Sequence, residues 1–179
     1  MDFRPIFLIL GYLLTTLAVV MIIPALVDLV AGNHDWQVFA VSSGLTLFIG
    51  VSLALTSRSG KARLSVRQAF IITTLSWLVL TIFASLPFAF SVLDMSVTDA
   101  FFEAMSGITT TGATVLTDLQ NVPPGILLWR ALLQWLGGIG IIVMALAILP
   151  VLRVGGMQLF RMESSDPSEK AMPRAAQVA

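Results

Sequence analysis

Residues 97–114 read VTDAFFEAMSGITTTGAT and are the most informative part of the sequence. The first part of this stretch, residues 97–108, has the composition of a helix and follows Ser96, a residue type that often caps a helix N-terminus. Residues 104–117 carry no charge, and Asp118 follows them. An apolar run of this length is too short to cross a bilayer and is typical of a re-entrant segment. We therefore predict a half helix that enters a membrane and an extended return to the same side.

The composition of the whole chain is that of a membrane protein. Of its 179 residues, 57% are hydrophobic and only 11% are charged, and the formal net charge is zero. A soluble domain has about 25% charged residues, so this chain could not cover a water-soluble surface. These values argue against a soluble enzyme, a disordered tail and a nucleic-acid-binding protein. The absence of cysteine from the sequence excludes a disulfide scaffold.

Four long uncharged runs surround the re-entrant stretch: residues 5–27, 36–57, 68–93 and 131–152. At about 1.5 Å per residue, a helix of each length can cross a hydrocarbon core of about 30 Å. Lipid offers no hydrogen-bond partners to an open backbone, so each run is predicted to be helical. The predicted transmembrane helices are residues 6–30, 37–56, 69–90 and 126–151. A cleaved signal peptide is the alternative for the first run, but its apolar core would span only about 7–15 residues.

The basic residues predict the orientation of these helices. All of the lysines and arginines except Arg130 lie on one side of the predicted spans: Arg4, Arg58, Lys61, Arg63, Arg67, Arg153, Arg161, Lys170 and Arg174. The positive-inside rule then places both termini in the cytoplasm. Apart from Arg130, the charged residues of the outer side are all acidic: Asp28, Asp35, Asp94, Asp99, Glu103 and Asp118. Solvated loop charges are the favoured interpretation, and a field that concentrates cations is the alternative.

Residues 109–114, which read TTTGAT, have the chemistry of a site for a dehydrated cation. Extended backbone at membrane depth must line a protein-enclosed or watery cavity, where its carbonyl oxygens can replace the water shell of an ion. Gly112 permits the positive φ that turns successive carbonyls toward one axis, and the negative end of the preceding helix favours a cation. On the residues alone, a threonine-rich outer loop with Gly107 or Gly112 as a helix C-cap remains open.

Residues 100–114 resemble the first pore loop of TrkH-type potassium uptake proteins of the Trk/Ktr/HKT superfamily. The runs 134–143 (QWLGGIGIIV) and 149–159 (LPVLRVGGMQL) are similar to the same family. The resemblance implies an all-α integral membrane fold with four transmembrane helices plus one re-entrant pore helix and loop. It would be one helix–pore loop–helix repeat of a potassium channel, preceded by two extra helices.

The same resemblance implies a division of the chain and a set of site residues. Residues 1–66 would be the leading helix pair, 67–155 the first repeat and 156–179 a cytoplasmic segment of an incomplete chain. The potassium ligands would be the carbonyls of Thr110, Thr111 and Gly112, with support from Thr109, Ala113 and Glu103.

The resemblance also implies partners and a location. It implies a multi-pass protein of the bacterial inner membrane that transports potassium by symport and carries no covalently bound cofactor. The full-length protein would be a homodimer that binds a cytoplasmic nucleotide-binding regulatory subunit. Because a carbonyl filter needs four loops and this chain has one, two alternatives stay open. They are a one-repeat homotetrameric cation channel and a non-conducting membrane scaffold or accessory subunit.

Several single residues receive predictions of their own. Arg130 is expected to pair with Glu103 or Asp118, because it is the only basic residue on the outer side. The small residues of 137–140 are expected to let helices approach closely, rather than to form a nucleotide-binding turn. Trp36 and Trp129 fit an aromatic belt at the membrane surface. His34 is the only histidine, so no set of transition-metal ligands is available.

Overall fold

The computed structural model describes residues 3–57 and 66–152. All of the regular secondary structure within these ranges is α-helical. The helices are α1 (Arg4–Val30), α2 (Trp36–Thr56), α3 (Val66–Ala84), α4 (Leu86–Phe90), α5 (Val97–Ile108) and α6 (Pro124–Leu152). Four segments are long and apolar enough to cross a membrane: Arg4–Val30, Trp36–Thr56, Arg67–Phe90 and Pro124–Ala145. The predicted spans agree with these within a few residues. The predicted basic loop around residues 58–63, most of the 149–159 run and the predicted cytoplasmic segment 156–179 lie outside the described residues.

The third predicted span, 69–90, is not one continuous helix. It divides at Ser85 into α3 and α4, and Pro87 lies in the first turn of α4. Proline has no N–H to donate to the preceding turn, and its ring crowds the carbonyl four residues before it. Pro24, in contrast, lies within α1, which continues to Val30.

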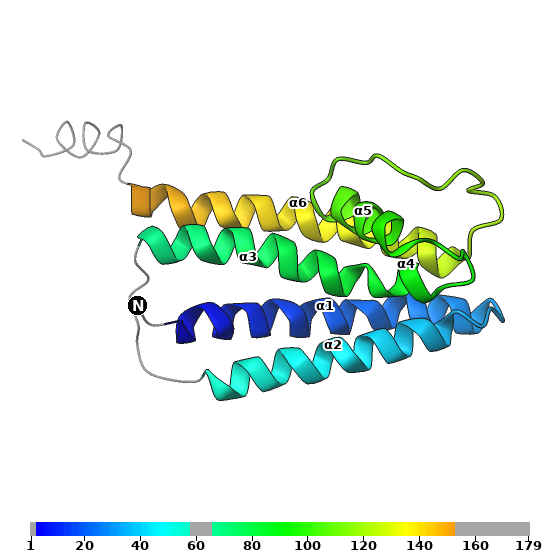
Figure 1. Ribbon diagram of the computed structural model, residues 1–179, viewed down its shortest axis with the longest axis horizontal. Coiled ribbons are helices and arrows are strands. Elements are labelled where there is room, and N and C mark those ends of the chain that lie inside the picture. The colour runs from blue at the N-terminus through cyan, green and yellow to red at the C-terminus, as the bar shows by residue number, and fades with distance from the viewer. Residues whose placement is uncertain (1–2, 58–65, 153–179) are drawn as a thin grey trace, which may run out of the picture. The chain divides into compact units, whose positions relative to one another are not determined.

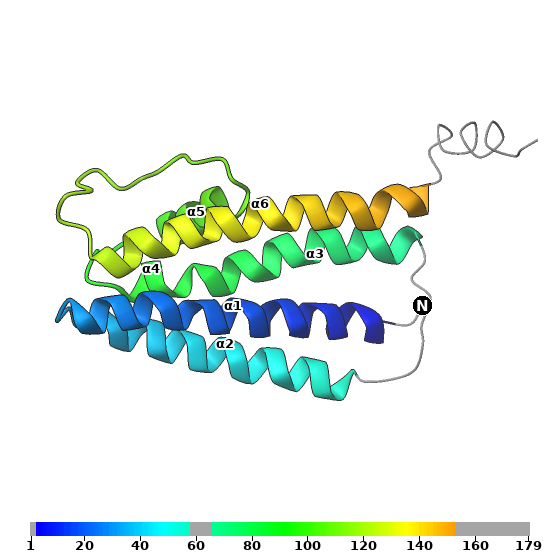
Figure 2. The ribbon, with the colours of Figure 1, turned by 180° about the vertical axis from the view of Figure 1, so that it is seen from behind.

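The leading pair, α1 and α2, is closely packed. The two helices lie side by side in both views (Figure 1; Figure 2). A Cβ atom added at Gly11 would lie 2.6 Å from the backbone nitrogen of Ala54, and one added at Gly50 would lie 2.8 Å from that of Thr15. Glycine is therefore required at both crossings, as is common where membrane helices approach closely.

One end of the unit formed by residues 3–144 carries the α1–α2 turn, α4 and the beginning of α6 (Figure 1). We call it the loop end. The apolar core near it contains Phe39, Phe88, Ile126 and Trp129, all without exposed surface. The indole N–H of Trp129 donates to the carbonyl of Ala84 over 3.0 Å. The aromatic-belt prediction is therefore wrong for Trp129, because its polar atom is satisfied inside the protein rather than at the membrane surface.

Helix α5 begins and ends as predicted. The Ser96 hydroxyl accepts a hydrogen bond from the backbone N–H of Asp99 over 3.1 Å, so Ser96 is the expected N-cap. Helix α5 packs against α3 and α4 and lies beside α6 in both views (Figure 1; Figure 2). A Cβ atom at Gly137 of α6 would lie 1.8 Å from the carbonyl oxygen of Ile108. The prediction of close helix packing is confirmed for Gly137.

Candidate functional site

The segment that follows α5 directs its backbone N–H groups back at the helix. The N–H of Thr109 donates to the carbonyl of Met105 over 2.9 Å. The N–H groups of Thr111 and Gly112 both donate to the carbonyl of Ser106, over 3.0 and 3.3 Å. These bonds satisfy carbonyls that the end of a helix would otherwise leave without partners.

These bonds also orient the carbonyl groups of the loop. In a trans peptide, the C=O of one residue points opposite to the N–H of the next. Because the N–H groups of Thr111 and Gly112 face the helix, the carbonyls of Thr110 and Thr111 point away from it. Ala113 differs, because its carbonyl accepts the Ser106 hydroxyl over 2.5 Å. The carbonyl of Ala113 therefore faces α5, whereas those of Thr110 and Thr111 face away from it.

Two residues of the loop have positive φ angles. Gly112 has φ +79°, as the sequence predicted, and Thr110 has φ +59°. A β-branched residue in this region is a genuine outlier, and such strain persists only where surrounding interactions fix the backbone. The Thr109 hydroxyl, which donates to the Met105 carbonyl over 2.7 Å and lies 2.8 Å from the Thr111 hydroxyl, is one such interaction. No sequence signal identifies Thr110 as the strained position.

Glu103 is fully buried and connects three parts of the site. One carboxylate oxygen accepts the backbone N–H of Val115 over 3.0 Å, and the Thr114 hydroxyl lies 3.0 and 3.1 Å from the two oxygens. Arg130 of α6 forms an ion pair with the same carboxylate. The predicted pairing of Arg130 with Glu103 is confirmed, and Asp118 instead accepts a hydrogen bond from Asn121. A buried carboxylate needs such partners to offset its lost hydration.

Sequence reasoning gave no specific role to two side chains of this site: Ser106, and Thr114 at the end of the candidate segment 109–114. Both are small hydroxyl residues, a type that is common in membrane helices and loops for many reasons. Their partners, the Ala113 carbonyl and the Glu103 carboxylate, come close only because the chain turns back along α5. Ala113 and Thr114 follow the end of α5, so the periodicity of a helix could not have predicted either contact.

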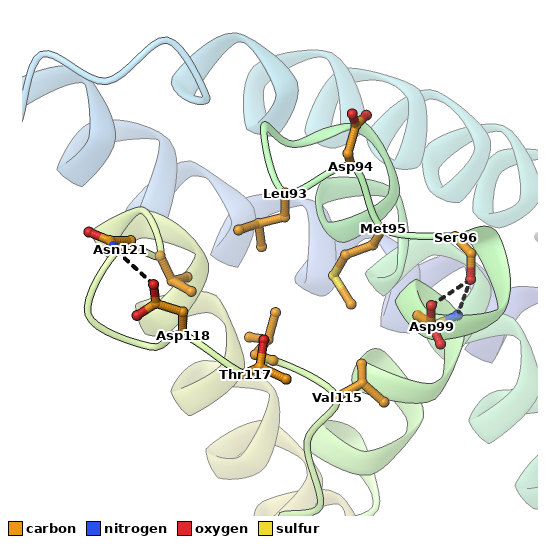
Figure 3. Close-up of a pocket in the computed structure, with 11 residues that line it drawn as sticks. Leu93, Asp94, Met95, Ser96, Asp99, Val115, Thr117, Asp118 and Asn121 are labelled. Atoms are coloured by element: carbon orange, nitrogen blue, oxygen red, sulfur yellow. Dashed lines mark hydrogen bonds between the residues drawn. The ribbon is translucent and has the colours of Figure 1, made fainter.

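A pocket of about 520 Å³ lies where the chain enters α5 and where it approaches α6 (Figure 3). Its lining includes the carboxylates of Asp94, Asp99 and Asp118. Asp99 accepts the Ser96 hydroxyl over 2.7 Å, and Asp118 accepts the side-chain amide of Asn121 over 2.7 Å (Figure 3). Asp94, Asp99 and Asp118 are exposed, which fits the favoured interpretation of solvated loop charges. That interpretation is wrong for Asp28, Asp35 and Glu103, which are buried.

Comparisons with known proteins agree on one family. A family model described as TrkH, cation transport protein, matches residues 35–178. The chain is 46% identical to the Trk system potassium uptake protein TrkH of Escherichia coli K12, covering 100% of this chain and 38% of that protein. It is 45% identical to TrkI of Halomonas elongata, covering 98% of this chain and 36% of that protein.

A solved structure gives the same result for the fold. The crystal structure of the potassium transporter TrkH from Vibrio parahaemolyticus matches 87% of this chain with a TM-score of 0.79 and 46% identity. The match covers 34% of that structure's chain. The present chain thus spans little more than a third of the length of the relatives that it matches.

Proposed function

Because the chain belongs to the TrkH family of cation transport proteins, we propose that it forms the N-terminal part of a potassium transporter. In this proposal residues 1–66 are the leading helix pair, 67–155 the first helix–pore loop–helix repeat and 156–179 a cytoplasmic segment. Helix α5 is the re-entrant pore helix. The chain contributes one of four filter loops, and the remaining loops come from later repeats of the complete transporter.

The single observation that carries this proposal is the orientation of the loop carbonyls. Thr110 and Thr111 present carbonyl oxygens away from α5 because the N–H groups that follow them bond to Ser106. Together with the carbonyl of Gly112, they are the proposed potassium ligands, replacing water around the ion as it enters. The C-terminal end of α5, which carries negative partial charge, adds a favourable field for the cation.

The supporting residues keep this short segment in place. Thr109 and Ala113 are tied to α5 through the carbonyl of Met105 and the hydroxyl of Ser106. Glu103 holds the outgoing chain at Val115 and pairs with Arg130. A rigid arrangement of this kind lets the oxygens approach one ion without first reorganising, which is the general requirement for a preorganised site.

The proposal includes a location and partners. Four membrane-length helices make this a multi-pass membrane protein. The bias of lysine and arginine supports the bacterial inner membrane topology with both termini in the cytoplasm. We propose that the complete transporter is a homodimer and that a nucleotide-binding regulatory subunit docks on the cytoplasmic side.

A chimera tests the proposed function directly. Residues 1–179 replace the matching segment of TrkH from Vibrio parahaemolyticus, which is 46% identical, in a bacterial host without potassium uptake systems. Growth at low potassium and rubidium uptake are measured. We expect the chimera to restore uptake and Gly112→Ala to reduce potassium selectivity, because alanine is strained at φ +79°.

Gly44→Ala is the matched control, because nothing lies within 4 Å of a Cβ atom added there in the described chain. Both variants must reach the membrane at equal levels. Unchanged selectivity of Gly112→Ala would count against the filter assignment, and a chimera that reaches the membrane without transporting potassium would count against the function as a whole.

A further inference from the structure

Two buried aspartates lie at the loop end of the leading pair. Asp28 is in the last turn of α1, and Asp35 immediately precedes α2. The exposed fraction is 0% for Asp28 and 2% for Asp35. Carboxylates are seldom fully buried without a specific partner, so each of them calls for a structural reason.

Each aspartate accepts a backbone N–H from the part of the chain that follows the leading pair. Asp28 Oδ1 accepts the N–H of Gly125 over 2.7 Å. Asp35 accepts the N–H of Val92, whose nitrogen lies 3.3 and 3.5 Å from its two carboxylate oxygens. Val92 comes just after α4, and Gly125 is in the first turn of α6.

We propose that Asp28 and Asp35 form a carboxylate clamp that holds both ends of the pore segment, residues 92–125. This inference rests on the proposed function, because the segment between the two contacts contains α5 and the candidate filter. The leading pair is then a positioning device for the filter, beyond its role as two further membrane crossings.

The contact between Asp28 and Gly125 leaves no room for a side chain at position 125. A Cβ atom at Gly125 would lie 2.2 Å from Asp28 Oδ2, so any side chain here would displace the carboxylate. The N–H groups of the first turn of a helix have no partners within the helix, and negative charge is favourable at this end. Asp28 therefore acts as a cap for α6 that is supplied from another helix.

The position of α6 determines the surroundings of the filter. Successive turns of α6 carry Arg130, which pairs with Glu103, Leu133, which faces Gly107, and Gly137, which faces the Ile108 carbonyl. A shift of α6 along its axis would move all three contacts together. Losing the clamp should therefore alter ion discrimination, in addition to any effect on the amount of folded protein.

The first test measures discrimination in the chimera described above. Potassium and sodium transport are compared for Asp28→Ala, Asp28→Asn and Gly125→Ala at matched membrane levels. We expect Asp28→Ala and Gly125→Ala to lower the potassium-to-sodium ratio about fivefold, since each loses a charge-assisted hydrogen bond. Asp28→Asn should stay within about twofold of the parent, because its amide oxygen can still accept the Gly125 N–H.

Asp118→Ala serves as the control, since this exposed carboxylate lies within the pore segment and, in the described chain, bonds locally to Asn121. An unchanged ratio in Asp28→Ala, or an Asp28→Asn variant as impaired as Asp28→Ala, would overturn the clamp.

The second test does not depend on transport. Hydrogen–deuterium exchange of the 179-residue chain in lipid nanodiscs reports the amides of Gly125 and Val92. We expect both amides to be protected in the parent. Asp28→Ala should accelerate exchange at Gly125, and Asp35→Ala should accelerate it at Val92, while amides within α2 keep their rates. Fast exchange at both amides in the parent would overturn the clamp even if the chimera transports potassium. Protected amides in a chain whose chimera transports nothing would instead refute the proposed function alone.

Discussion

At the scale of single residues, Glu103 is the side chain on which the candidate site depends most. It binds the outgoing chain at Val115 and pairs with Arg130 from a different helix. We predict that Glu103→Ala lowers the free energy of unfolding of the chain by about 3 kcal/mol, because it leaves a partly buried arginine without its partner. Thermal unfolding in detergent measures the loss.

A second variant separates the charge pair from the backbone contact. Replacing both residues, Glu103→Met with Arg130→Met, removes both charges and should recover part of the stability. Potassium selectivity of the chimera should not recover with it, because Val115 would still lack its acceptor. A double variant that is no more stable than Glu103→Ala would show that the unpaired charge of Arg130 does not cause the loss of stability.

Single residues of the site differ in how far the sequence could predict their conformation and contacts. The positive φ of Gly112 and the Arg130–Glu103 pair could be anticipated, because glycine tolerates that backbone and only one basic residue was available on that side. The positive φ of Thr110 could not be anticipated, since a threonine side chain disfavours the backbone conformation that the hydrogen bonds of the loop impose. Trp129 was assigned wrongly because a tryptophan near a span end looks the same in sequence whether it faces lipid or a buried carbonyl.

At the scale of helices, the contact between α5 and α6 depends on the absence of a side chain at Gly137. Gly137→Ala would place a Cβ atom 1.8 Å from the Ile108 carbonyl oxygen, so the two helices would have to separate. Overpacking of this kind costs about 1–3 kcal/mol. We expect a corresponding fall in thermal stability of the purified chain. Gly138→Ala is the control, because nothing in the described chain lies within 4 Å of its added Cβ, and an equal loss there would contradict the prediction.

Asp35, which precedes α2, should make the free energy of unfolding depend on pH. Burial raises the pKa of Asp35 above its ordinary value of 3.8, although the Val92 N–H and nearby His34 oppose the shift. An acid with a raised pKa in the folded state destabilises the fold once it is ionised, so its cost is full above the folded pKa and disappears below 3.8.

Asp35→Asn should remove this cost while retaining an acceptor for Val92. We expect the variant to gain stability relative to the parent at neutral pH and to lose that advantage as the pH falls toward 4, as measured by unfolding across this range. An advantage that is constant with pH would show that the carboxyl group of Asp35 does not titrate differently in the folded chain.

The positions of the helices could be predicted where length, hydropathy or a capping residue gave a clear signal. Length and hydropathy placed the four spans, and Ser96 marked the start of α5 through its capping hydroxyl. The division between α3 and α4 was not predicted, although Pro87 was visible. A proline near the end of an apolar run can either end a span or interrupt it, and that outcome depends on which neighbours satisfy the freed carbonyls.

For the molecule as a whole, the proposed filter would need four loops to surround an ion, and the described residues contain one candidate loop. A single loop leaves Thr110, Thr111 and Gly112 exposed, as they are in this structure. An ion there would keep most of its water, because only one set of carbonyls could replace it. We therefore predict that the 179-residue chain, reconstituted alone in liposomes, carries no potassium flux above empty liposomes, whereas the chimera does.

Flux assays with a potassium-loaded interior and a fluorescent potential probe make this comparison, with circular dichroism to verify that the isolated chain is helical. The one-repeat channel would give the opposite result, since four copies of the chain could complete the ring by themselves. Selective flux from the isolated chain, together with a fourfold assembly by mass measurement, would show that four copies of the chain form the filter. The proposal that later repeats of a longer transporter complete it would then be wrong. The contacts of Glu103 and Arg130 would be needed in either assembly, because they form within one copy of the chain.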